Sequence, residues 1–229
     1  MHPFKKIFEG TSHELRPIPA YVLERSAGSN LYLLAGVHGD EIEGMNLLDS
    51  LWKNLCGPYL AGQQIFSTLI VIPCLNPDGK MVSTRVNARG VDLNRNLPSS
   101  QWQKEFTEAK YNPGHAPLSE PENQTLLEIF KIYPPKFIVS FHSWRPMLNW
   151  NGKCEPEAKF LHQFNKYPVV GDIEDYPTPG SLGEYGPQKH QCPVLTFECP
   201  LYSQGASAQS ITNENLEGLL QLVRLWPNF

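Results

Sequence analysis

Two continuous apolar runs, at 67–76 (STLIVIPCLN) and 136–144 (KFIVSFHSW), constrain the fold of this chain more than any other feature. Neither run alternates apolar with polar residues, so each is expected to form a strand that is buried on both faces of a sheet. Strands of that kind occur almost only where helices cover both faces of the sheet. The two runs therefore predict an α/β protein.

Shorter patterns predict the remaining elements. Three more strands are expected, at 20–24, 30–36 and 193–200. Helical spacing of apolar residues or a polar helix start predicts four helices, at 40–55, 119–133, 155–166 and 213–226. At the start of the second of these helices, SEPENQ indicates Ser119 as the N-cap. NPDG at 76–79 indicates a turn, and residues 80–118 have no sustained period, which predicts a long loop region of the kind that is usually functional.

The alternation of strands with helices defines the expected fold class. It is an α/β/α sandwich with a mixed, largely parallel central sheet. A length of 229 residues fits one domain, and neither an internal repeat nor a shift in composition marks a boundary. A single domain over residues 1–229 is therefore expected.

Charge and composition exclude several classes of partner. A net charge of −4 gives no basic surface for nucleic acid, and no apolar run approaches the ~18–20 residues that cross a bilayer. The first 17 residues contain no apolar segment typical of a secretory signal. The five cysteines are odd in number, widely spaced and without a CxxC pair, which indicates reduced thiols. A cytoplasmic protein without nucleic-acid or membrane partners is expected.

Four polar residues lie at or just beyond the ends of three predicted strands. His38 and Glu41 follow strand 30–36, His142 lies near the end of its strand, and Glu198 lies near the end of strand 193–200. In parallel α/β sheets such positions meet at one edge. Two imidazoles and one carboxylate around zinc, with water in the fourth position, form a hydrolytic site. Taken alone, the HxxE spacing fits a polar helix start equally well, and a lone histidine fits a strand end.

The segment 83–98 (STRVNARGVDLNRNLP) concentrates cationic and amide side chains. Arg85, Arg89 and Arg95 fall within eleven positions, beside three asparagines. One interpretation is a solvated basic loop. The other is a hydrolase that uses one arginine to bind a free carboxylate and another to stabilise a tetrahedral oxyanion.

Taken together, these motifs resemble the M14 zinc carboxypeptidases. GVHGDEIEG, NPDG, TRVNARGVDLNRN, LSEPENQ, FHSW and TFEC occur in the order and spacing of that family, from about residue 9 to about residue 200. YNPGHAPLSEPE, FHSWRPMLNWNG and YPTPGSLGEYG are most similar to its bacterial murein peptide amidase branch. That resemblance implies cleavage of the γ-D-glutamyl–diaminopimelate bond of recycled murein tripeptide in the cytoplasm.

The resemblance also implies roles for individual residues. It implies one Zn²⁺ per chain, held by His38, Glu41 and His142. It makes Glu198 the general base, and it makes Arg85 the group that polarises the scissile carbonyl and holds the oxyanion. The remaining carried-over residues are two that bind the terminal carboxylate, a tyrosine that closes over substrate and a carboxylate that orients a ligand histidine: Asn94, Arg95, Tyr176 and Asp92. Tyr185 is an alternative to Tyr176, and Arg89 has no assigned role.

Other polar residues are expected to be structural. The remaining histidines, including His13, are interpreted as loop or surface residues, and three glutamates as first-turn residues of helices: Glu43, Glu120 and Glu122. A diaminopimelate side chain carries an ammonium and a carboxylate, so a charged specificity pocket is expected. Its candidates are Asp172, Glu174, Asp175, Glu184, Lys189 and Arg145.

Three alternative functions fit parts of this pattern. A zinc amidohydrolase of the succinylglutamate desuccinylase or aspartoacylase type also uses HxxE, an arginine and a remote histidine. The second alternative is a carboxypeptidase that acts on ordinary peptides. The third is a catalytically inactive binding module that keeps the fold. The complete LSEPENQ, GVDLNRN and TFE motifs favour a peptidase.

Overall fold

The computed structural model describes residues 3–25, 29–57, 64–171, 173 and 176–228. In these residues the strands are β1 (Lys5–Thr11), β2 (Pro17–Leu23), β3 (Asn30–Ala35), β4 (Thr68–Ile72), β5 (Phe137–Trp144), β6 (Met147–Asn151), β7 (Val169–Val170) and β8 (Val194–Pro200). The helices are α1 (Ile42–Cys56), α2 (Pro77–Val82), α3 (Pro121–Ile132), α4 (Glu155–Asn165), α5 (Leu182–His190) and α6 (Ala208–Leu225). Short 3₁₀ turns are η2 (Leu93–Arg95), η3 (Ala109–Tyr111) and η4 (Tyr202–Gln204).

The strands form one mixed eight-stranded sheet in the order β1-β2-β4-β3-β5-β8-β6-β7. Its centre, β4-β3-β5-β8, is parallel. β1 and β2 pair antiparallel with their neighbours, and β6 pairs antiparallel with β8 and parallel with β7. Every residue of β3 and β4 is buried, as their uninterrupted apolar sequences predict. The parallel centre brings the carboxyl ends of β3, β5 and β8 to one edge.

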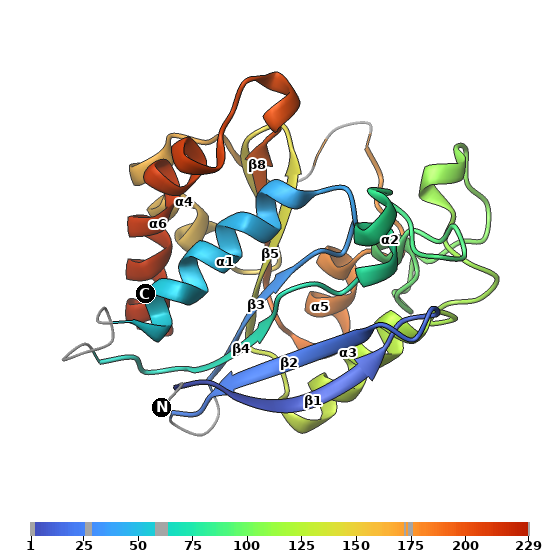
Figure 1. Ribbon diagram of the computed structural model, residues 1–229, viewed down its shortest axis with the longest axis horizontal. Helices are drawn as coiled ribbons and strands as arrows, with labels where there is room; N and C mark the ends of the chain where they lie inside the picture. Colours follow the sequence, from blue (N-terminus) through green and yellow to red (C-terminus); the bar gives the residue numbers. More distant parts are fainter. Residues whose placement is uncertain (1–2, 26–28, 58–63, 172, 174–175, 229) are drawn as a thin grey trace.

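Helices cover both faces of this sheet (Figure 1). On one face α1, α4 and α6 pack over a core that includes Leu33, Leu48 and Leu219. On the other face α3 and α5 enclose a second core around Tyr32 and Phe130. The predicted α/β/α arrangement is therefore confirmed.

Several boundaries differ from the sequence prediction. The turn predicted at NPDG is the start of α2, because the Asn76 side chain caps it by accepting from the Gly79 N–H. Ser119 is not the N-cap of α3: Glu120 takes that position, and the Ser119 hydroxyl donates to the Glu120 carboxylate. Helix α6 begins at Ala208, five residues earlier than predicted, where Ser207 forms a capping box with Ser210. The strands β1 and β6 and the helix α5 were not predicted from the sequence.

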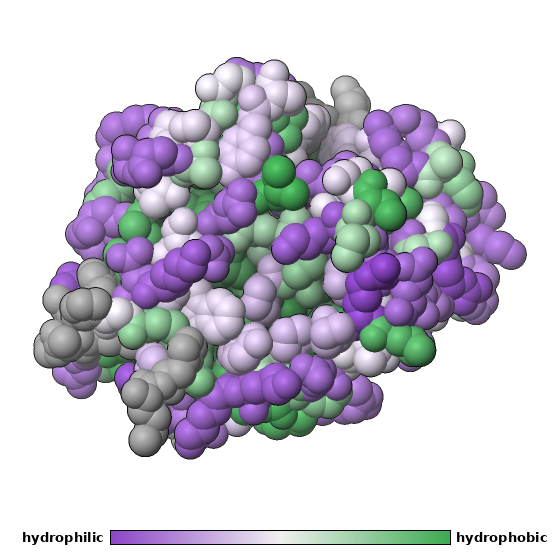
Figure 2. Space-filling view, viewed as in Figure 1, coloured by the Kyte–Doolittle hydropathy of each residue, from purple (hydrophilic) through white to green (hydrophobic). Residues whose placement is uncertain are grey.

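The outer surface is mostly polar on the face drawn in Figure 2, where apolar side chains form small separated areas. This distribution agrees with apolar residues gathered in the two cores. Among the helices that the structure describes, none is both long and apolar enough to cross a membrane.

Candidate active site

His38 lies on the loop that connects β3 to α1. The loop turns sharply at Gly36, which has a φ of +66°, a conformation that favours glycine. Gly39 packs so closely on α2 that a Cβ there would lie 2.1 Å from the Gly79 carbonyl carbon. These two glycines allow the loop to hold the His38 side chain, 3% exposed, at the carboxyl edge of the sheet.

Glu41 and His142 meet His38 at this edge. Glu41 is the N-cap residue of α1, yet its carboxylate makes no cap hydrogen bond, because it points to the two histidines. His142 lies within β5, two residues before the strand ends, and the Ser143 N–H donates to Glu41 Oε2 at 3.2 Å. The three ligand groups predicted from the sequence are therefore brought together.

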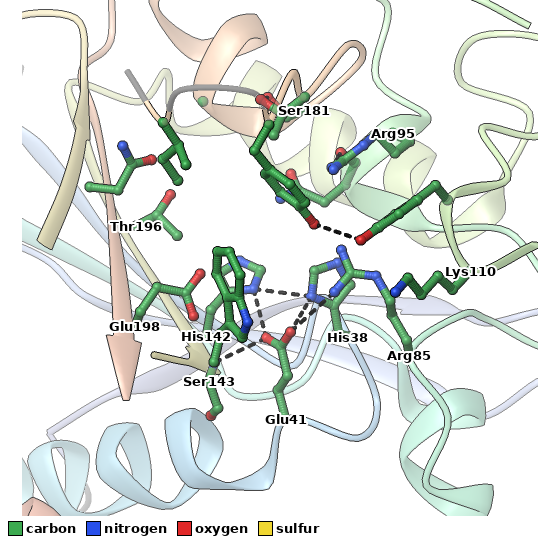
Figure 3. Close-up of a pocket in the computed structure, with 18 of the residues that line it drawn as sticks. His38, Glu41, Arg85, Arg95, Lys110, His142, Ser143, Ser181, Thr196 and Glu198 are labelled. Carbon is green, nitrogen blue, oxygen red and sulfur yellow. Dashed lines mark hydrogen bonds and ion pairs between the residues drawn. The ribbon is translucent and has the colours of Figure 1, made fainter. Parts of the chain in front are cut away.

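The donor atoms of this triad converge on one point (Figure 3). Nδ1 of His38 lies 2.6 Å from Glu41 Oε1, and Nδ1 of His142 lies 2.8 Å from Glu41 Oε2. The two Nδ1 atoms are 3.2 Å apart. All three side chains are buried, and their donor atoms lie within 4.8 Å of one another.

The opposite ring nitrogens are held by other residues. His38 Nε2 lies 3.1 Å from Asp92 Oδ1, and His142 Nε2 lies 3.0 Å from Ser140 Oγ. If each Nε2–H donates to that oxygen, each Nδ1 keeps a free lone pair toward the centre of the triad. Two neutral imidazoles and one carboxylate are a donor set that zinc accepts, so these residues fit the metal.

The charges around the triad favour a bound cation. Burial opposes ionisation of Glu41, but His38 and His142 outweigh it and hold the pKa of the carboxyl below its usual range. Burial likewise opposes ionisation of Asp92, whose pKa is nevertheless lowered by His38 and by Arg85. Two buried carboxylates in their charged form thus surround the imidazoles.

Arg85 lies beside the triad and is fixed by Asp92. Its Nε and Nη2 donate to Asp92 Oδ2 at 3.1 and 3.0 Å, and its Nη1 donates to Glu41 Oε1 at 3.4 Å. A bidentate contact of this kind fixes the plane of a guanidinium. Arg85 is therefore held at the rim of the cavity, next to the position of the predicted metal.

Asn94 and Arg95 face the same cavity from η2. The Asn94 Oδ1 accepts from the Leu182 N–H at 2.9 Å, which leaves its NH₂ group as the available donor. Arg95 is 5% exposed and makes no ion pair within the described residues; its Nη1 donates to the Asn94 carbonyl at 2.8 Å. A buried guanidinium without a carboxylate partner is suited to binding an anionic ligand.

Glu198 faces the triad from β8, where it is the register partner of His142 on β5 (Figure 3). Burial, together with the nearby Glu41 carboxylate, raises the pKa of Glu198 to about 8. Its Oε2 is buried without a hydrogen-bond partner among the described residues. A buried carboxyl with an unpaired oxygen in a cavity is typical of a group that exchanges protons with a ligand.

Tyr176 also lines the cavity, whereas Tyr185 packs in the second core beside His190. The Tyr176 hydroxyl donates to the Tyr111 hydroxyl at 3.2 Å, and its ring lies 5.4 Å from that of Trp144. Of the two tyrosines that the sequence offered, only Tyr176 reaches the cavity.

The cavity has a volume of about 440 Å³, and its walls include residues that sequence reasoning missed. Asn149 and Asn151 of β6 line it beside Thr196, because Asn149 is the register partner of Thr196. Lys110 and Tyr111 reach it from η3. The two asparagines alternate along a strand, a period-2 signal that the sequence offered; the irregular loop of η3 offered none.

Of the six charged residues expected in the specificity pocket, the three that the structure describes do not line the cavity. Glu184 accepts from Ser99 and from the Gly180 N–H, Lys189 is exposed, and neither lines the cavity; nor does Arg145, which stacks on Trp144. Asp172, Glu174 and Asp175 lie outside the described residues. Among the described residues, neutral side chains that line the cavity include Asn149, Asn151 and Thr196.

The three glutamates interpreted as helix-start residues do lie at helix starts, and all three are also buried. Glu120 and Glu122 are both 0% exposed, and Asn87 Nδ2 donates to each of them. His13 is only partly exposed and pairs with Glu120 at 2.8 Å, so it is not a free surface residue. Glu43 accepts from the Tyr202 N–H. These contacts come from distant parts of the chain, which a local pattern does not reveal.

A parallel α/β sheet with two histidines, a carboxylate and arginines gathered at the ends of its strands is typical of metal-dependent hydrolases. Residues 4–199 match the zinc carboxypeptidase family (peptidase M14), and the chain belongs to that family. It is therefore a peptide-bond hydrolase of a zinc-dependent family.

Individual relatives agree with this membership. Murein peptide amidase A of Vibrio campbellii is 31% identical over 222 residues, which are 92% of this chain and 82% of the relative. Murein peptide amidase A of Escherichia coli K12 is 33% identical over 193 residues, 79% and 72% of the two chains. The crystal structure of murein-tripeptide amidase MpaA from Escherichia coli O157 aligns with a TM-score of 0.76 at 28% identity, covering 98% of this chain and 92% of that one.

Proposed function

We propose that this chain is a zinc-dependent amidase that hydrolyses the γ-D-glutamyl–meso-diaminopimelate bond of murein tripeptide, with one Zn²⁺ held by His38, Glu41 and His142. The observation that carries the proposal is the convergence of these three ligands with Arg85, Arg95 and Glu198 around one cavity. The choice of a murein substrate is supported by the names of the relatives at 31–33% identity.

In this proposal the cationic side chains orient the substrate. Arg95 and the Asn94 amide bind the carboxylate of the terminal residue, since Arg95 has no carboxylate partner among the described residues. That contact places the scissile carbonyl between the triad and Arg85. The guanidinium of Arg85, fixed by Asp92, then donates to the oxyanion as the carbonyl carbon becomes tetrahedral.

Glu198 transfers a proton from the attacking water to the leaving amine. A zinc ion in the triad supplies an activated water and polarises the scissile carbonyl. The positive charge of a zinc ion in the triad would lower the pKa of Glu198 from about 8 and favour its carboxylate form. That carboxylate accepts a proton from the attacking water and delivers it to the nitrogen of the leaving amine. Its unpaired Oε2 is the atom we assign to this transfer. Tyr176 closes over the bound terminal residue, and Tyr111 holds its hydroxyl when substrate is absent.

The side chain of the terminal residue enters the part of the cavity lined by Asn149, Asn151 and Thr196. The Asn149 NH₂ donates to the Val170 and Gly171 carbonyls, which leaves its Oδ1 as an acceptor for the ammonium of diaminopimelate. The Asn151 amide and the Thr196 hydroxyl can donate to its carboxylate. A long apolar or aromatic side chain would leave these groups unpaired, which costs binding free energy. The pocket thus favours a polar, doubly charged terminal side chain.

We also propose a cytoplasmic location. The five cysteines are free thiols, and three of them are buried: Cys154, Cys192 and Cys199. Unpaired thiols of this kind are typical of a reducing compartment. Recycled murein tripeptide is the substrate that this location implies.

The function is tested by incubating the zinc-loaded protein with L-Ala-γ-D-Glu-meso-diaminopimelate. Matched reactions contain ordinary peptides that end in Lys, Phe or Glu, and N-acylated amino acids such as acetylaspartate and succinylglutamate. We expect diaminopimelate to be released from the murein tripeptide at least tenfold faster than product is released from any of the other substrates. The reason is that a substrate that leaves buried polar groups unpaired loses roughly 1–3 kcal/mol. Faster release from ordinary peptides, or deacylation, overturns the murein assignment.

A further inference from the structure

Lys110 brings a positive charge to the cleft from η3. It belongs to the region 80–118, for which the sequence predicted only an irregular functional loop. Its side chain lines the cavity beside Arg85, on the opposite side of the zinc triad from Thr196 and Glu198 (Figure 3). No role has been assigned to it by the proposed reaction.

Three cationic side chains lie near the aromatic ring of Tyr111. The guanidinium carbons of Arg85 and Arg95 lie 5.6 and 5.4 Å from the ring centroid, and Lys110 Nζ lies 4.8 Å from it. Such a ring face stabilises nearby cations and keeps them in place. Lys110 of η3 and Arg95 of η2 thus bring cations to the same wall of the cleft as Arg85.

These cations differ in what else they contact. Arg85 is already paired with the buried Asp92, and Arg95 is assigned to the terminal carboxylate of the substrate. Among the described residues, the one carboxylate that pairs with the Lys110 ammonium is that of Glu108, at 3.2 Å, and both side chains are more than half exposed. An exposed pair of this kind is weak, so Lys110 is free to exchange Glu108 for an anion bound in the cleft.

The proposed substrate carries an anion at the corresponding place. If the terminal side chain lies near Thr196, the residue on the acyl side of the scissile bond extends past Arg85 toward the wall opposite Thr196. In a γ-linked glutamyl residue the α-carboxylate is free, because the bond to the next residue uses the side-chain carboxyl. This wall is the one that carries Lys110.

On the basis of the proposed function, we infer that Lys110 binds the free α-carboxylate of the γ-linked acidic residue on the acyl side of the scissile bond. Lys110 is then a specificity-determining residue that distinguishes an acidic acyl residue from a neutral one. The site accordingly recognises three groups of the substrate: the terminal carboxylate, the terminal side chain and the α-carboxylate of the preceding residue.

The test compares two substrates that differ only in this carboxylate: L-Ala-γ-D-Glu-meso-diaminopimelate and its α-carboxamide analogue, L-Ala-γ-D-isoglutaminyl-meso-diaminopimelate. The wild-type enzyme is expected to have a kcat/KM about tenfold higher for the carboxylate, the size of a partly exposed charged contact. Lys110→Met keeps the aliphatic stem and is expected to remove this preference, through KM and not through kcat, because the contact is present before and during the reaction. Lys110→Arg is expected to retain it.

Lys104→Met is the matched control, since Lys104 is an exposed lysine of the same loop region and does not line the cavity. It is expected to leave both rates unchanged. Equal kcat/KM for the two substrates in the wild type, or an equal loss on both in Lys110→Met, overturns the role of Lys110 while leaving the proposed function intact. Failure of the wild type to cleave either substrate overturns both.

Discussion

At the scale of single residues, Glu198 is the position whose substitution best separates proton transfer from zinc binding. We predict that Glu198→Gln retains zinc and the fold but loses turnover by a factor of at least about 10²–10³, because the amide neither accepts nor returns the proton. The side chain keeps its shape, and its Oε2 has no partner among the described residues to lose, so the variant is expected to fold. Steady-state rates and elemental analysis of zinc measure the two effects separately.

Two outcomes would remove Glu198 from the proton-transfer role. One is substantial activity with intact zinc, and the other is loss of zinc in parallel with activity, which would make Glu198 a ligand. Thr196→Val is a suitable neighbouring control on β8, since it alters the wall of the terminal side-chain pocket. It is expected to change KM for the tripeptide and to leave the catalytic proton transfer in place.

At the scale of elements, Asp78 joins α2 to the turn between β1 and β2. Its carboxylate accepts from the Ser12 hydroxyl at 2.6 Å, from the Glu14 N–H at 3.0 Å and from Arg16 Nη1 at 2.6 Å. Burial opposes ionisation of Asp78, but these three hydrogen bonds outweigh it and lower its pKa below 3.8. The antiparallel edge of the sheet is thereby fixed to the helix that packs against Gly39, next to His38.

We predict that Asp78→Asn lowers the free energy of unfolding by about 1–3 kcal/mol at pH 7, the cost of weakening hydrogen bonds to a charged group. Because the folded-state pKa is depressed, this stabilisation is present above pH 3.8 and is lost as the pH falls below it. Urea denaturation at pH 7, 5 and 3 should therefore show the gap in the free energy of unfolding between variant and wild type narrowing only at the lowest pH. A gap that is constant with pH, or absent at pH 7, contradicts the prediction.

Glu14→Gln supplies the control for this experiment. Glu14 also pairs with Arg16, but its side chain is 57% exposed, so the pair contributes little. Loss of the ion pair between Glu14 and Arg16 is expected to change the free energy of unfolding by less than about 0.5 kcal/mol. A comparable effect of the two variants would assign the stabilisation to Arg16 and not to the buried carboxylate.

The elements also show what the sequence was able to predict. The meeting of His38 with His142 was predictable, because parallel strands with apolar sequences place their carboxyl ends at one edge. The positions of Glu120 and Glu122 were not, since a polar helix start looks the same whether it faces water or a buried partner. Their burial depends on Asn87 and His13, which arrive from distant segments.

Sequence patterns likewise did not predict that η3 forms a wall of the cleft. Lys110 and Tyr111 lie in a stretch without periodicity, and their place beside Arg95 depends on the path of the whole loop. By contrast, Asn149 alternates with Asn151 along β6, and its pairing with Thr196 follows once β6 is placed next to β8. The parts of the site carried by regular strands were predictable from periodicity, whereas loop residues such as Arg85 and Arg95 were predictable only through the motif that contains them.

At the scale of the whole molecule, zinc is expected to stabilise a fold that does not require it. The two cores on either side of the sheet are built from apolar contacts that lie outside the triad. Removal of zinc with a chelator should therefore preserve the far-UV circular dichroism spectrum. Restored zinc binds the folded state through ligands that the unfolded chain does not bring together, so it should raise Tm.

The expected size of that rise follows from mass action. Zinc at about 100 times its Kd adds about 2.7 kcal/mol, and each kcal/mol shifts Tm by about 2–4 °C for a chain of this length, giving a rise of roughly 5–10 °C. His142→Ala and the isosteric Glu41→Gln should lose most of this zinc-dependent rise while keeping the spectrum of the apo-protein. A full rise in Tm in both variants would place the metal elsewhere, and collapse of the apo-protein would make zinc a structural ion as well as the proposed catalytic one.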